Sequence, residues 1–413
     1  MDIYLVGGAV RDELLQLPVT DRDWVVIGST PQKMIDANFR PVGSDFPVFL
    51  HPESHEEYAL ARTERKTAPG YRGFEFDTSP DVTLEEDLQR RDLTINAIAK
   101  DSSNNLIDPF GGRKDIENRV LRHVSEAFSE DPVRVLRVAR FMARFASLGF
   151  TVAEETMELM RTMVTSGEVS ALVAERIWQE FDKALSSDDP AVFIETLRHC
   201  QALGVILPEV DKLFGIPQTA KHHPEVDTGI HTLMVLRQAT VASTCSRVRF
   251  AALCHDVGKG TTDPSLLPSH HGHEERGAEL VVELCNRLRA PKKFQQLAVV
   301  CARFHTHCHR AKELKPSSLV KLLSALDITR QPALFRDFLT VCESDARGRL
   351  GFEKQNYPQA DFLRAVAEAY LGVDAAAIAN AQSSPELIPA ALHDARLHAI
   401  KPLTQSGSDQ NPL

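Results

Sequence analysis

The chain has 413 residues, which is more than one hydrophobic core supports and predicts two or three domains. Hydrophobic residues make up 43% and charged residues 25%, a balance that excludes a largely disordered or membrane-embedded chain. The formal net charge of −10 argues against a uniformly basic nucleic-acid-binding surface, so any binding of phosphates must rely on local clusters of arginine and lysine.

The seven cysteines are scattered, and no two of them form a Cys-x-x-Cys pair. Such a set predicts neither a disulfide framework nor a structural zinc site, and it favours a reducing compartment. No basic segment followed by an apolar run opens the chain, and no apolar run reaches the length of about 18 residues that a membrane span needs. We therefore expect a cytoplasmic protein.

The first motif joins a short apolar strand to a pair of glycines. Residues 3–6 predict a buried strand, Gly7 and Gly8 a tight turn, and residues 9–17 a helix. Because a helix N-terminus presents free N–H groups and a positive dipole end, this turn can hold a phosphate, with Arg11 close by. Taken alone, Gly-Gly before a helix is ordinary turn chemistry.

Two aspartates follow on the next predicted strand, residues 21–27. Asp21 and Asp23 are two residues apart, so their carboxylates point the same way and can reach one pair of divalent ions. Two-metal phosphoryl transfer uses ions roughly 3.5–4 Å apart. Alone, such a pair is more often a solvated strand end. The third carboxylate of such a site stays open, and Glu57 is a candidate only by its position in a strand.

The order of strand, Gly-Gly turn, helix and Asp-x-Asp strand resembles the active-site core of DNA polymerase beta-like nucleotidyltransferases. More narrowly, residues 7–12 with the aspartate pair resemble the class II tRNA nucleotidyltransferase and bacterial poly(A) polymerase family. The resemblance implies that Asp21 and Asp23 are catalytic and bind two Mg²⁺ ions. It also implies that Gly8 and Arg11 hold the triphosphate.

The rest of the N-terminal region predicts one mixed sheet with helices. We expect a helix at residues 31–37, strands at 46–50 and 57–63, and a loop over the polar stretch 64–80. Residues 120–124 are expected to form the last strand of the same sheet.

A capping-box pattern, Thr83-x-x-Glu86, predicts a helix to about residue 89. It leads into Arg90-Arg-Asp-x-Thr-Ile-Asn-Ala, whose polar side chains offer donors for a triphosphate and a ribose. Alone, this segment is more often a salt-bridged helix face. It resembles the second signature of the same family, which implies that Arg91 contacts the incoming nucleotide.

A further helix is predicted to start at Asp131 as N-cap, with Pro132 in its first turn. It carries an arginine every third or fourth residue, at Arg134, Arg137, Arg140 and Arg144. At about 100° per residue these side chains share an arc of roughly 120°. From the spacing alone, this arc is as compatible with a solvated face as with a binding face.

In the family, a Glu-Asp-x-x-Arg-x-x-Arg pattern reads the nucleobase in place of a nucleic-acid template. The pattern maps to residues 130–137, which implies that Asp131, Arg134 and Arg137 bind the nucleotide, with Arg140 one turn further. An aspartate accepts from an exocyclic amino group and an arginine donates to a ring nitrogen and carbonyl, so such a pair accepts cytosine or adenine and mismatches guanine and uracil. Specificity for CTP and then ATP is what the resemblance implies.

A second chemical centre is predicted from the histidines of the C-terminal half. An apolar helix ends in His255-Asp256, and because adjacent helical side chains point about 100° apart, each needs partners from other helices. With His231 before them and Asp345 far downstream, they resemble the order His, His-Asp, Asp of the HD-domain phosphohydrolases. A single histidine is more often a surface or core residue, but the four in this order favour a metal site.

Further histidines surround this set. His273 and His305 match additional histidines of many HD members, whereas we expect His307 and His309 on the surface and the neighbouring cysteines in the core. Imidazole and carboxylate ligands without thiolate suit Mn²⁺, Ni²⁺, Co²⁺ or Zn²⁺ better than Mg²⁺. The resemblance implies 2′,3′-cyclic phosphodiesterase, 2′-nucleotidase and phosphatase activities.

Together these patterns predict an α+β fold, with a polymerase beta-like mixed sheet followed by all-α segments. The expected domains are a nucleotidyltransferase head at 1–140, a helical neck at 141–220 that carries RNA rather than chemistry, an HD domain at 221–350, and a helical tail at 351–413 that is disordered from residue 404. The chain as a whole resembles bacterial CCA-adding enzymes with an HD domain. This implies the tRNA 3′ end, CTP and ATP as partners, no membrane and no DNA, and a monomer or homodimer.

Three other functions stay open. A poly(A) polymerase shares the first two signatures, although the HD domain and acidic balance favour CCA addition because an unlimited RNA polymeriser would be expected to carry a basic tail. An HD phosphohydrolase with a non-catalytic RNA-binding N-terminal domain is the second, and the presence of both Asp21 and Asp23 argues against it. A non-catalytic RNA chaperone would require both metal sites to be idle.

Overall fold

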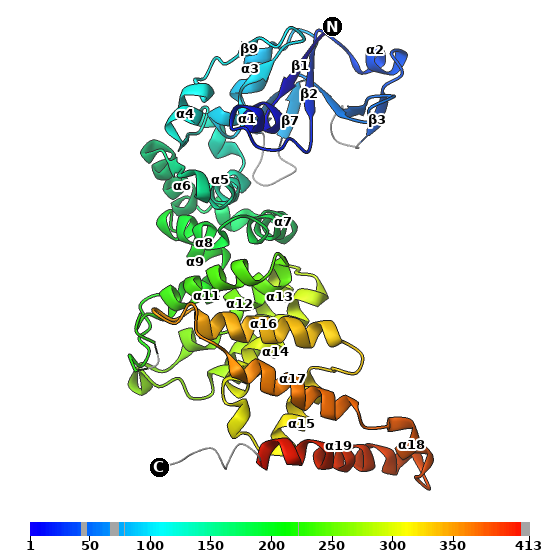
Figure 1. The fold of residues 1–413 in the computed structure, drawn as a ribbon. Helices are drawn as coiled ribbons and strands as arrows, with labels where there is room; N and C mark the ends of the chain where they lie inside the picture. Colours follow the sequence, from blue (N-terminus) through cyan, green and yellow to red (C-terminus); the bar gives the residue numbers. More distant parts are fainter. Residues whose placement is uncertain (43–47, 67–73, 78, 222, 406–413) are drawn as a thin grey trace. The chain divides into compact units, whose positions relative to one another are not determined.

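The computed structural model describes residues 1–42, 48–66, 74–77, 79–221 and 223–405. The chain divides into two compact units (Figure 1). The first contains Met1–Asp188 and Val192–Ile206, and the second contains Asp189–Ala191 and Leu207–Leu413. The predicted α+β class is confirmed, because the strands lie in the first unit and the second is helical throughout its described part.

A mixed seven-stranded sheet, in the order β3-β4-β5-β2-β1-β8-β9, forms the base of the first unit. Its strands are β1 (Asp2–Val6), β2 (Asp23–Ile27), β3 (Arg40–Val42), β4 (Val48–Leu50), β5 (Glu57–Leu60), β8 (Ala99–Lys100) and β9 (Leu106–Ile107). The central strand β2 runs antiparallel to β1 and parallel to β5. This pairing puts the start of β2, where the predicted catalytic aspartates lie, in the middle of the sheet.

Successive side chains of β2 enter two different apolar clusters. Val25 packs with Leu88 of helix α3 (Leu84–Gln89), whereas Val26 packs with Met34 of helix α2 (Pro31–Asp36). Because side chains two apart on a strand share a face, Asp23 projects on the same face as Val25. The carboxylate therefore faces the side of the sheet that α3 covers.

Helix α3 begins as the capping box predicts. The Thr83 N–H donates to Glu86 Oε2 at 2.8 Å, and the Glu86 N–H donates to Thr83 Oγ1 at 3.3 Å. The helix expected at 31–37 is confirmed as α2, whose N-cap is Thr30. Both helices thus start where a hydroxyl satisfies backbone donors that would otherwise lack a partner.

Two expectations for this region are wrong. The stretch 64–80 is not all loop, because β6 (Thr63–Lys66) and β7 (Phe74–Asp77) pair antiparallel, while 67–73 and 78 lie outside the described residues. Such a ribbon is held by its own backbone hydrogen bonds and needs no alternating apolar pattern. The strand expected at 120–124 is β10 (Val120–Leu121), which pairs with β11 (Thr151–Val152) rather than with the main sheet.

Helices complete the first unit. They are α1 (Gly8–Leu14), α4 (Gly112–Asn118), α5 (Val133–Arg144), α6 (Glu154–Thr165), α7 (Ala174–Leu185), α8 (Pro190–His199) and α9 (Leu203–Ile206). Helix α5 packs against α7 and buries Val135, Leu136 and Val138 completely. Residue 140, where a boundary between head and neck is expected, lies within α5.

The second unit is a set of helices. They are α10 (Pro208–Asp211), α11 (Thr228–Ala242), α12 (Ser246–Cys254), α13 (His273–Arg287), α14 (Lys292–His309), α15 (Pro316–Ala325), α16 (Pro332–Arg347), α17 (Pro358–Leu371), α18 (Ala375–Asn380) and α19 (Ile388–Gln405). Helices α11, α12, α14 and α16 pack around one another, with α13 against α14. The tail expectation is wrong at Thr404, which is helical, and 406–413 lie outside the described residues.

No described helix is both long enough and apolar enough to span a membrane. None of the seven cysteines forms a disulfide, and all but Cys245 are buried. The expectation that Cys301 and Cys308 are small core side chains is confirmed, because both are completely buried.

Candidate functional sites

The Gly-Gly turn brings the start of α1 close to the segment that follows α3. Gly7 has a φ of 71°, in the left-handed region that favours glycine, and a Cβ at this position would lie 3.0 Å from Arg91 Nη1. Gly8 is half-buried and begins α1. The backbone of the turn thus comes close to the Arg91 guanidinium. This places Arg91 beside the predicted phosphate position.

Arg11 lies in the interior instead of at the surface of the turn. Its side chain is 3% exposed, donates from Nη1 to Asn96 Oδ1 at 2.6 Å, and pairs with Asp12 at 2.8 Å. The guanidinium also lies 5.0 Å from the centre of the Phe141 ring on α5. These contacts join α1 to α5, so Arg11 supports the turn from behind rather than presenting its charge to a triphosphate.

The two predicted catalytic aspartates lie at the entrance of β2. Asp23 is the first residue of the strand, and Asp21 precedes it; both are exposed. Desolvation by the surrounding protein raises the pKa of Asp23; the Arg91 guanidinium opposes this and the Asp21 carboxylate adds to it. Two carboxylates that approach each other in this way are a suitable place for a cation.

Glu57 lies directly opposite Asp23 in the parallel pairing of β2 with β5. Within the described part of the chain, however, every group of three His, Cys, Asp or Glu side chains whose ligand atoms lie within 4.8 Å of one another belongs to the second unit. The strand register thus places Glu57 next to the aspartates without making it a third ligand in this geometry.

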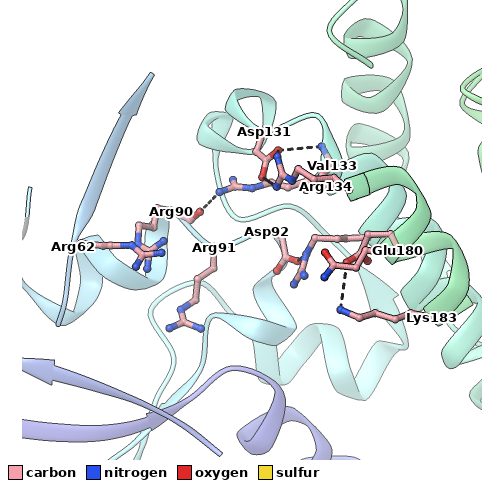
Figure 2. Close-up of a pocket in the computed structure, with 12 residues that line it drawn as sticks. Arg62, Arg90, Arg91, Asp92, Asp131, Val133, Arg134, Glu180 and Lys183 are labelled. Carbon is pink, nitrogen blue, oxygen red and sulfur yellow. Dashed lines mark hydrogen bonds and ion pairs between the residues drawn. The ribbon is translucent and has the colours of Figure 1, made fainter. Parts of the chain in front are cut away.

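Beyond the Gly-Gly turn, a cavity of about 440 Å³ gathers most of the predicted nucleotide ligands (Figure 2). Arg91, Asp131, Arg134 and Arg137 all line it. The remaining lining residues are Arg62, Arg90, Asp92, Val133, Arg176, Gln179, Glu180 and Lys183. Basic side chains outnumber acidic ones in this list, and such a surplus suits a polyphosphate.

The arginines on α5 are held in place by acceptors rather than solvated. Arg134 is 8% exposed and donates to the backbone carbonyls of Ala127 at 2.8 Å and Arg90 at 2.6 Å (Figure 2). Arg137 pairs with the buried carboxylate of Asp92 at 2.7 Å. Burial opposes ionisation of Asp92, but Arg137, the hydrogen bond from Asn96 and the charge of Arg134 together outweigh it and hold the pKa of Asp92 well below its usual range.

Asp131 and Arg140 are also engaged. Arg176 of α7 donates to both Asp131 oxygens, at 2.9 and 2.7 Å, and the Val133 N–H donates to Asp131 Oδ1 at 3.2 Å. Arg140 pairs with Glu180 of α7 at 2.5 Å and does not line the cavity. Of the four predicted base-reading residues, three therefore face the cavity and Arg140 fixes α5 to α7.

The sequence reasoning missed the contribution of α7. Its polar residues Arg176, Gln179, Glu180 and Lys183 line one wall of the cavity. They are spaced i, i+3, i+4 and i+7, which places them on one face of a helix. This polar stripe in the expected neck was the available signal, because a helix that only packs on a neighbour would show an apolar stripe at that spacing.

In the second unit, the four HD residues come together from three segments. His231 Nε2 lies 3.1 Å from Asp345 Oδ1, and His255 Nε2 lies 3.3 Å from Asp256 Oδ2 and 3.6 Å from Asp345 Oδ1. All four side chains are buried. Burial disfavours a charged imidazole, yet the Asp256 and Asp345 carboxylates raise the pKa of His255 to about 9. A site this negative attracts cations.

His273 and His305 join this centre through Asp256. Their Nε2 atoms lie 3.4 and 3.3 Å from Asp256 Oδ1 and 3.3 Å from each other. The structure therefore contains two adjoining groups of three candidate ligands, one with His231, His255 and Asp345 and the other with Asp256, His273 and His305. The two groups meet at the adjacent residues His255 and Asp256.

Backbone carbonyls orient three of these histidines. The Nδ1 atom of His255 contacts the Ala252 carbonyl at 2.7 Å, that of His273 the His270 carbonyl at 2.8 Å, and that of His305 the Cys301 carbonyl at 3.0 Å. A carbonyl only accepts, so each Nδ1 carries a proton and Nε2 is the atom that each ring can offer to a metal ion. All three Nε2 atoms therefore lie in the carboxylate-lined interior.

Unsatisfied atoms test whether these residues fit a metal ion. His255 Nε2 and Asp256 Oδ1 are buried and make no hydrogen bond within the described structure. Leaving such atoms without a partner is costly in a folded protein. A divalent cation would satisfy both, so the donor set fits the metal that an HD centre implies.

The expectation that His307 and His309 are surface residues is wrong. His309 Nε2 lies 2.6 Å from Asp345 Oδ2, and its Nδ1 lies 2.9 Å from the Tyr357 hydroxyl. His307 is half-buried against Phe304. The signal for His309 was its spacing of four residues from His305, which puts both on one face of α14.

A cavity of about 520 Å³ opens over this centre. His273 and His309 line it together with three basic residues, Lys259, Arg310 and Arg349. Lys259 already pairs with Asp256 at 2.6 Å, and Arg310 with Glu313 at 2.9 Å. The Arg349 Nε is buried and makes no hydrogen bond to the part of the chain that the structure describes, so this guanidinium is the best placed of the three to meet an anion.

Comparison with known proteins defines the class. Residues 3–122 match the family model "Poly A polymerase head domain", residues 149–214 the model "Probable RNA and SrmB- binding site of polymerase A", and residues 228–330 the model "HD domain". The fold is similar to that of solved CCA-adding enzymes. That of Thermotoga maritima complexed with tRNA-CCA is 17% identical, with a TM-score of 0.62 over 98% of this chain and 90% of that chain.

The enzyme of Bacillus stearothermophilus in complex with CTP is 23% identical, with a TM-score of 0.62 over 97% of this chain and 88% of that chain. Sequence relatives are more similar. The multifunctional CCA protein of Thioalkalivibrio sulfidiphilus is 60% identical over 403 residues, which cover 98% of both chains. That of Teredinibacter turnerae is 57% identical over 401 residues, 97% of this chain and 98% of the relative. The chain belongs to the multifunctional CCA protein family.

Proposed function

We propose that the first unit adds CCA to the 3′ end of tRNA from CTP and ATP, without a nucleic-acid template and with release of pyrophosphate. The observation that carries the proposal is the 440 Å³ cavity, which gathers Arg91, Asp131, Arg134 and Arg137. The names of the relatives and the CTP- and tRNA-bound neighbours support the choice of substrates.

In this reaction the terminal 3′-hydroxyl of tRNA attacks the α-phosphate of the nucleotide, and the bond to pyrophosphate breaks. Asp21 and Asp23 would hold Mg²⁺, which when bound would neutralise negative charge on the phosphates. Arg91, next to the glycine turn, binds the triphosphate and the leaving pyrophosphate. The protein itself thus supplies positioning and charge rather than a covalent intermediate.

The base-reading residues are fixed before the nucleotide arrives. Arg134 donates to two backbone carbonyls, which fix its guanidinium at the cavity wall, where it can face a ring nitrogen and a carbonyl of the base. The Asp131 carboxylate accepts three hydrogen bonds and keeps one lone pair for an exocyclic amino group. Cytosine and adenine carry this amino group at C4 and C6, the ring positions at which uracil and guanine carry a carbonyl instead.

The test is incorporation of labelled CTP and ATP, with Mg²⁺, into a tRNA transcript that lacks its 3′ CCA, resolved at single-nucleotide length. We expect two C and one A followed by a stop. A long ladder of A would instead support a poly(A) polymerase, which stays an alternative because residues 3–122 match the poly A polymerase head domain. No extension would contradict the proposal.

We also propose that the HD centre is a metal-dependent phosphohydrolase with 2′,3′-cyclic phosphodiesterase, 2′-nucleotidase and phosphatase activities. The unsatisfied His255 Nε2 and Asp256 Oδ1 support a transition metal such as Ni²⁺, Mn²⁺ or Co²⁺, which when bound activates water for attack on a phosphate. Arg349 holds the substrate anion at the mouth of the cavity, and Lys259 keeps Asp256 ionised and oriented.

The test of this second activity is hydrolysis of 2′,3′-cyclic AMP and 2′-AMP by the full chain after removal of metal and after addition of Ni²⁺, Mn²⁺ or Co²⁺. We expect activity only with added metal. Hydrolysis that is unchanged by chelation would contradict a role for the histidine cluster.

A further inference from the structure

Glu225 lies behind one of the HD histidines. Its Oε1 is 3.0 Å from His231 Nδ1, while His231 Nε2, on the opposite edge of the ring, is 3.1 Å from Asp345 Oδ1. The Glu225 side chain is 3% exposed, and its Oε2 accepts from the Leu350 N–H at 3.3 Å. The carboxylate is therefore held in place from a segment that follows α16.

His231 differs from the other histidines of the centre in what orients it. His255, His273 and His305 hydrogen-bond through Nδ1 to backbone carbonyls, and His273 Nδ1 also lies 3.4 Å from Glu274 Oε2. His231 Nδ1 has no such carbonyl within the described residues, and the buried Glu225 carboxylate lies at ion-pair distance from it. A carboxylate partner accepts a stronger hydrogen bond than a neutral carbonyl does, and it makes the opposite nitrogen a more basic ligand. His231 is thus placed by a carboxylate, whereas the other three rings are oriented by backbone carbonyls.

A rival explanation is a separate metal ion at His223, Glu225 and His231, whose ligand atoms also lie within 4.8 Å of one another. That ion would take His231 Nδ1 while the HD ion takes Nε2. A neutral imidazole has one lone pair and one N–H, so binding two ions would require loss of its last proton. Chemistry therefore favours one ion on Nε2 and a proton on Nδ1.

We propose that Glu225 is a positioning residue that fixes the Nδ1-protonated tautomer of His231 and aims its Nε2 at the HD metal position. The inference rests on the proposed phosphohydrolase centre. His223, whose Nδ1 lies 3.1 Å from Glu225 Oε1, then only adds a second hydrogen bond to the carboxylate. Loss of the carboxylate is expected to weaken metal binding 10- to 100-fold, the usual effect of removing such a partner.

The experiment compares Mn²⁺ affinity of the metal-free full chain, measured by titration calorimetry, with that of E225Q, His223→Ala and a control, Glu343→Gln. Glu343 is a partly buried glutamate on α16 that pairs with Arg347 and contacts no HD histidine. We expect E225Q to bind Mn²⁺ at least 10-fold more weakly, and His223→Ala and Glu343→Gln to stay within 3-fold of the wild type. Labelling with ¹⁵N-histidine adds a second readout, because the Nδ1 and Nε2 shifts of His231 report its tautomer directly.

The possible outcomes separate the inference from the function on which it rests. If the wild-type chain binds no Mn²⁺, the proposed metal centre fails. If the wild type binds and E225Q binds equally well with His231 still protonated on Nδ1, the centre stands and the role of Glu225 is overturned. If His223→Ala loses one equivalent of Mn²⁺, the separate third site is correct instead. Retained CTP incorporation by each variant shows that the first unit is folded, and an unchanged helical circular-dichroism signal shows the same for the second.

Discussion

The two sites of this chain hold their charges in opposite ways. In the nucleotide cavity each acidic lining residue is paired with an arginine, as Asp92 with Arg137, Asp131 with Arg176 and Glu180 with Arg140 show. In the HD centre, His255 Nε2 and Asp256 Oδ1 are buried and make no hydrogen bond within the described structure. A site that exchanges substrates is stable when empty if its own groups pair, whereas a site built for a resident ion leaves its ligands unsatisfied.

Because the two sites are built from different residues in different units, we predict that a mutation in one site leaves the activity of the other unchanged. Asp23→Asn removes a negative charge at the predicted Mg²⁺ position and should lower CTP incorporation about 1000-fold, because cation stabilisation of phosphoryl transfer is worth several kcal/mol. Hydrolysis of 2′-AMP by the same preparation should be unchanged. Glu57→Gln sharpens the test, since an equal loss would make Glu57 the third carboxylate. Normal incorporation by Asp23→Asn would contradict the assignment.

The converse change is Asp256→Asn, which weakens the carboxylate shared by His255, His273, His305 and Lys259. Bound Ni²⁺, measured by mass spectrometry after dialysis, should be lost, and 2′-AMP hydrolysis should fall about 1000-fold. CTP incorporation should persist. The exposed Asp361, which pairs only with Arg364 in the described structure, offers the control Asp361→Asn. Retained metal in Asp256→Asn would show that the ion lies elsewhere.

Breaking the ion pair between Arg137 and Asp92 tests whether the acidic residues of the nucleotide cavity depend on their arginine partners for stability. Arg137→Leu leaves Asp92 buried without its cation and should lower the free energy of unfolding by roughly 2 kcal/mol, less than for a fully buried pair because Arg137 is one-third exposed. The control is Arg144→Leu, since its partner Asp12 keeps Arg11. Urea unfolding at pH 7 measures both, and equal effects would contradict the argument.

The pH dependence of that pair has a definite sign. Because the native pKa of Asp92 is held well below its ordinary value, the stabilisation is fully present above about pH 4 and is lost as the pH falls toward the native pKa. In Arg137→Leu the native pKa rises, so this part of the acid-side loss of stability should shrink. Urea unfolding between pH 4 and pH 2 measures this loss, and an equal loss in the wild type and Arg137→Leu would argue against Asp92 as the group concerned.

The smallest expected effect concerns the mouth of the HD cavity. Arg349→Gln should raise the KM for 2′-AMP about 10-fold with little change in kcat, because the guanidinium binds the substrate anion in ground and transition states alike. Arg347→Gln is the matched control, since Arg347 pairs with Glu343 and does not line the cavity. An equal KM for both variants would remove Arg349 from the substrate site.

Local chemistry is what the sequence by itself determined. The strand and Gly-Gly turn before α1, the capping box of Thr83 and Glu86 and the order of the HD residues each depend on residues that are close in sequence or on a known order of ligands. Such signals survive any tertiary arrangement, because caps and turns are satisfied within a few residues. They sufficed for the fold class and for most candidate ligands.

Only the tertiary structure decided which side chains meet. It placed Arg11 in the interior, brought Arg176 of α7 onto Asp131, and set His309 against Asp345. It also put Glu225 behind His231. Whether a charged residue is a ligand, a support or a surface group depends on burial and on partners many residues away, and both arise only when the helices pack.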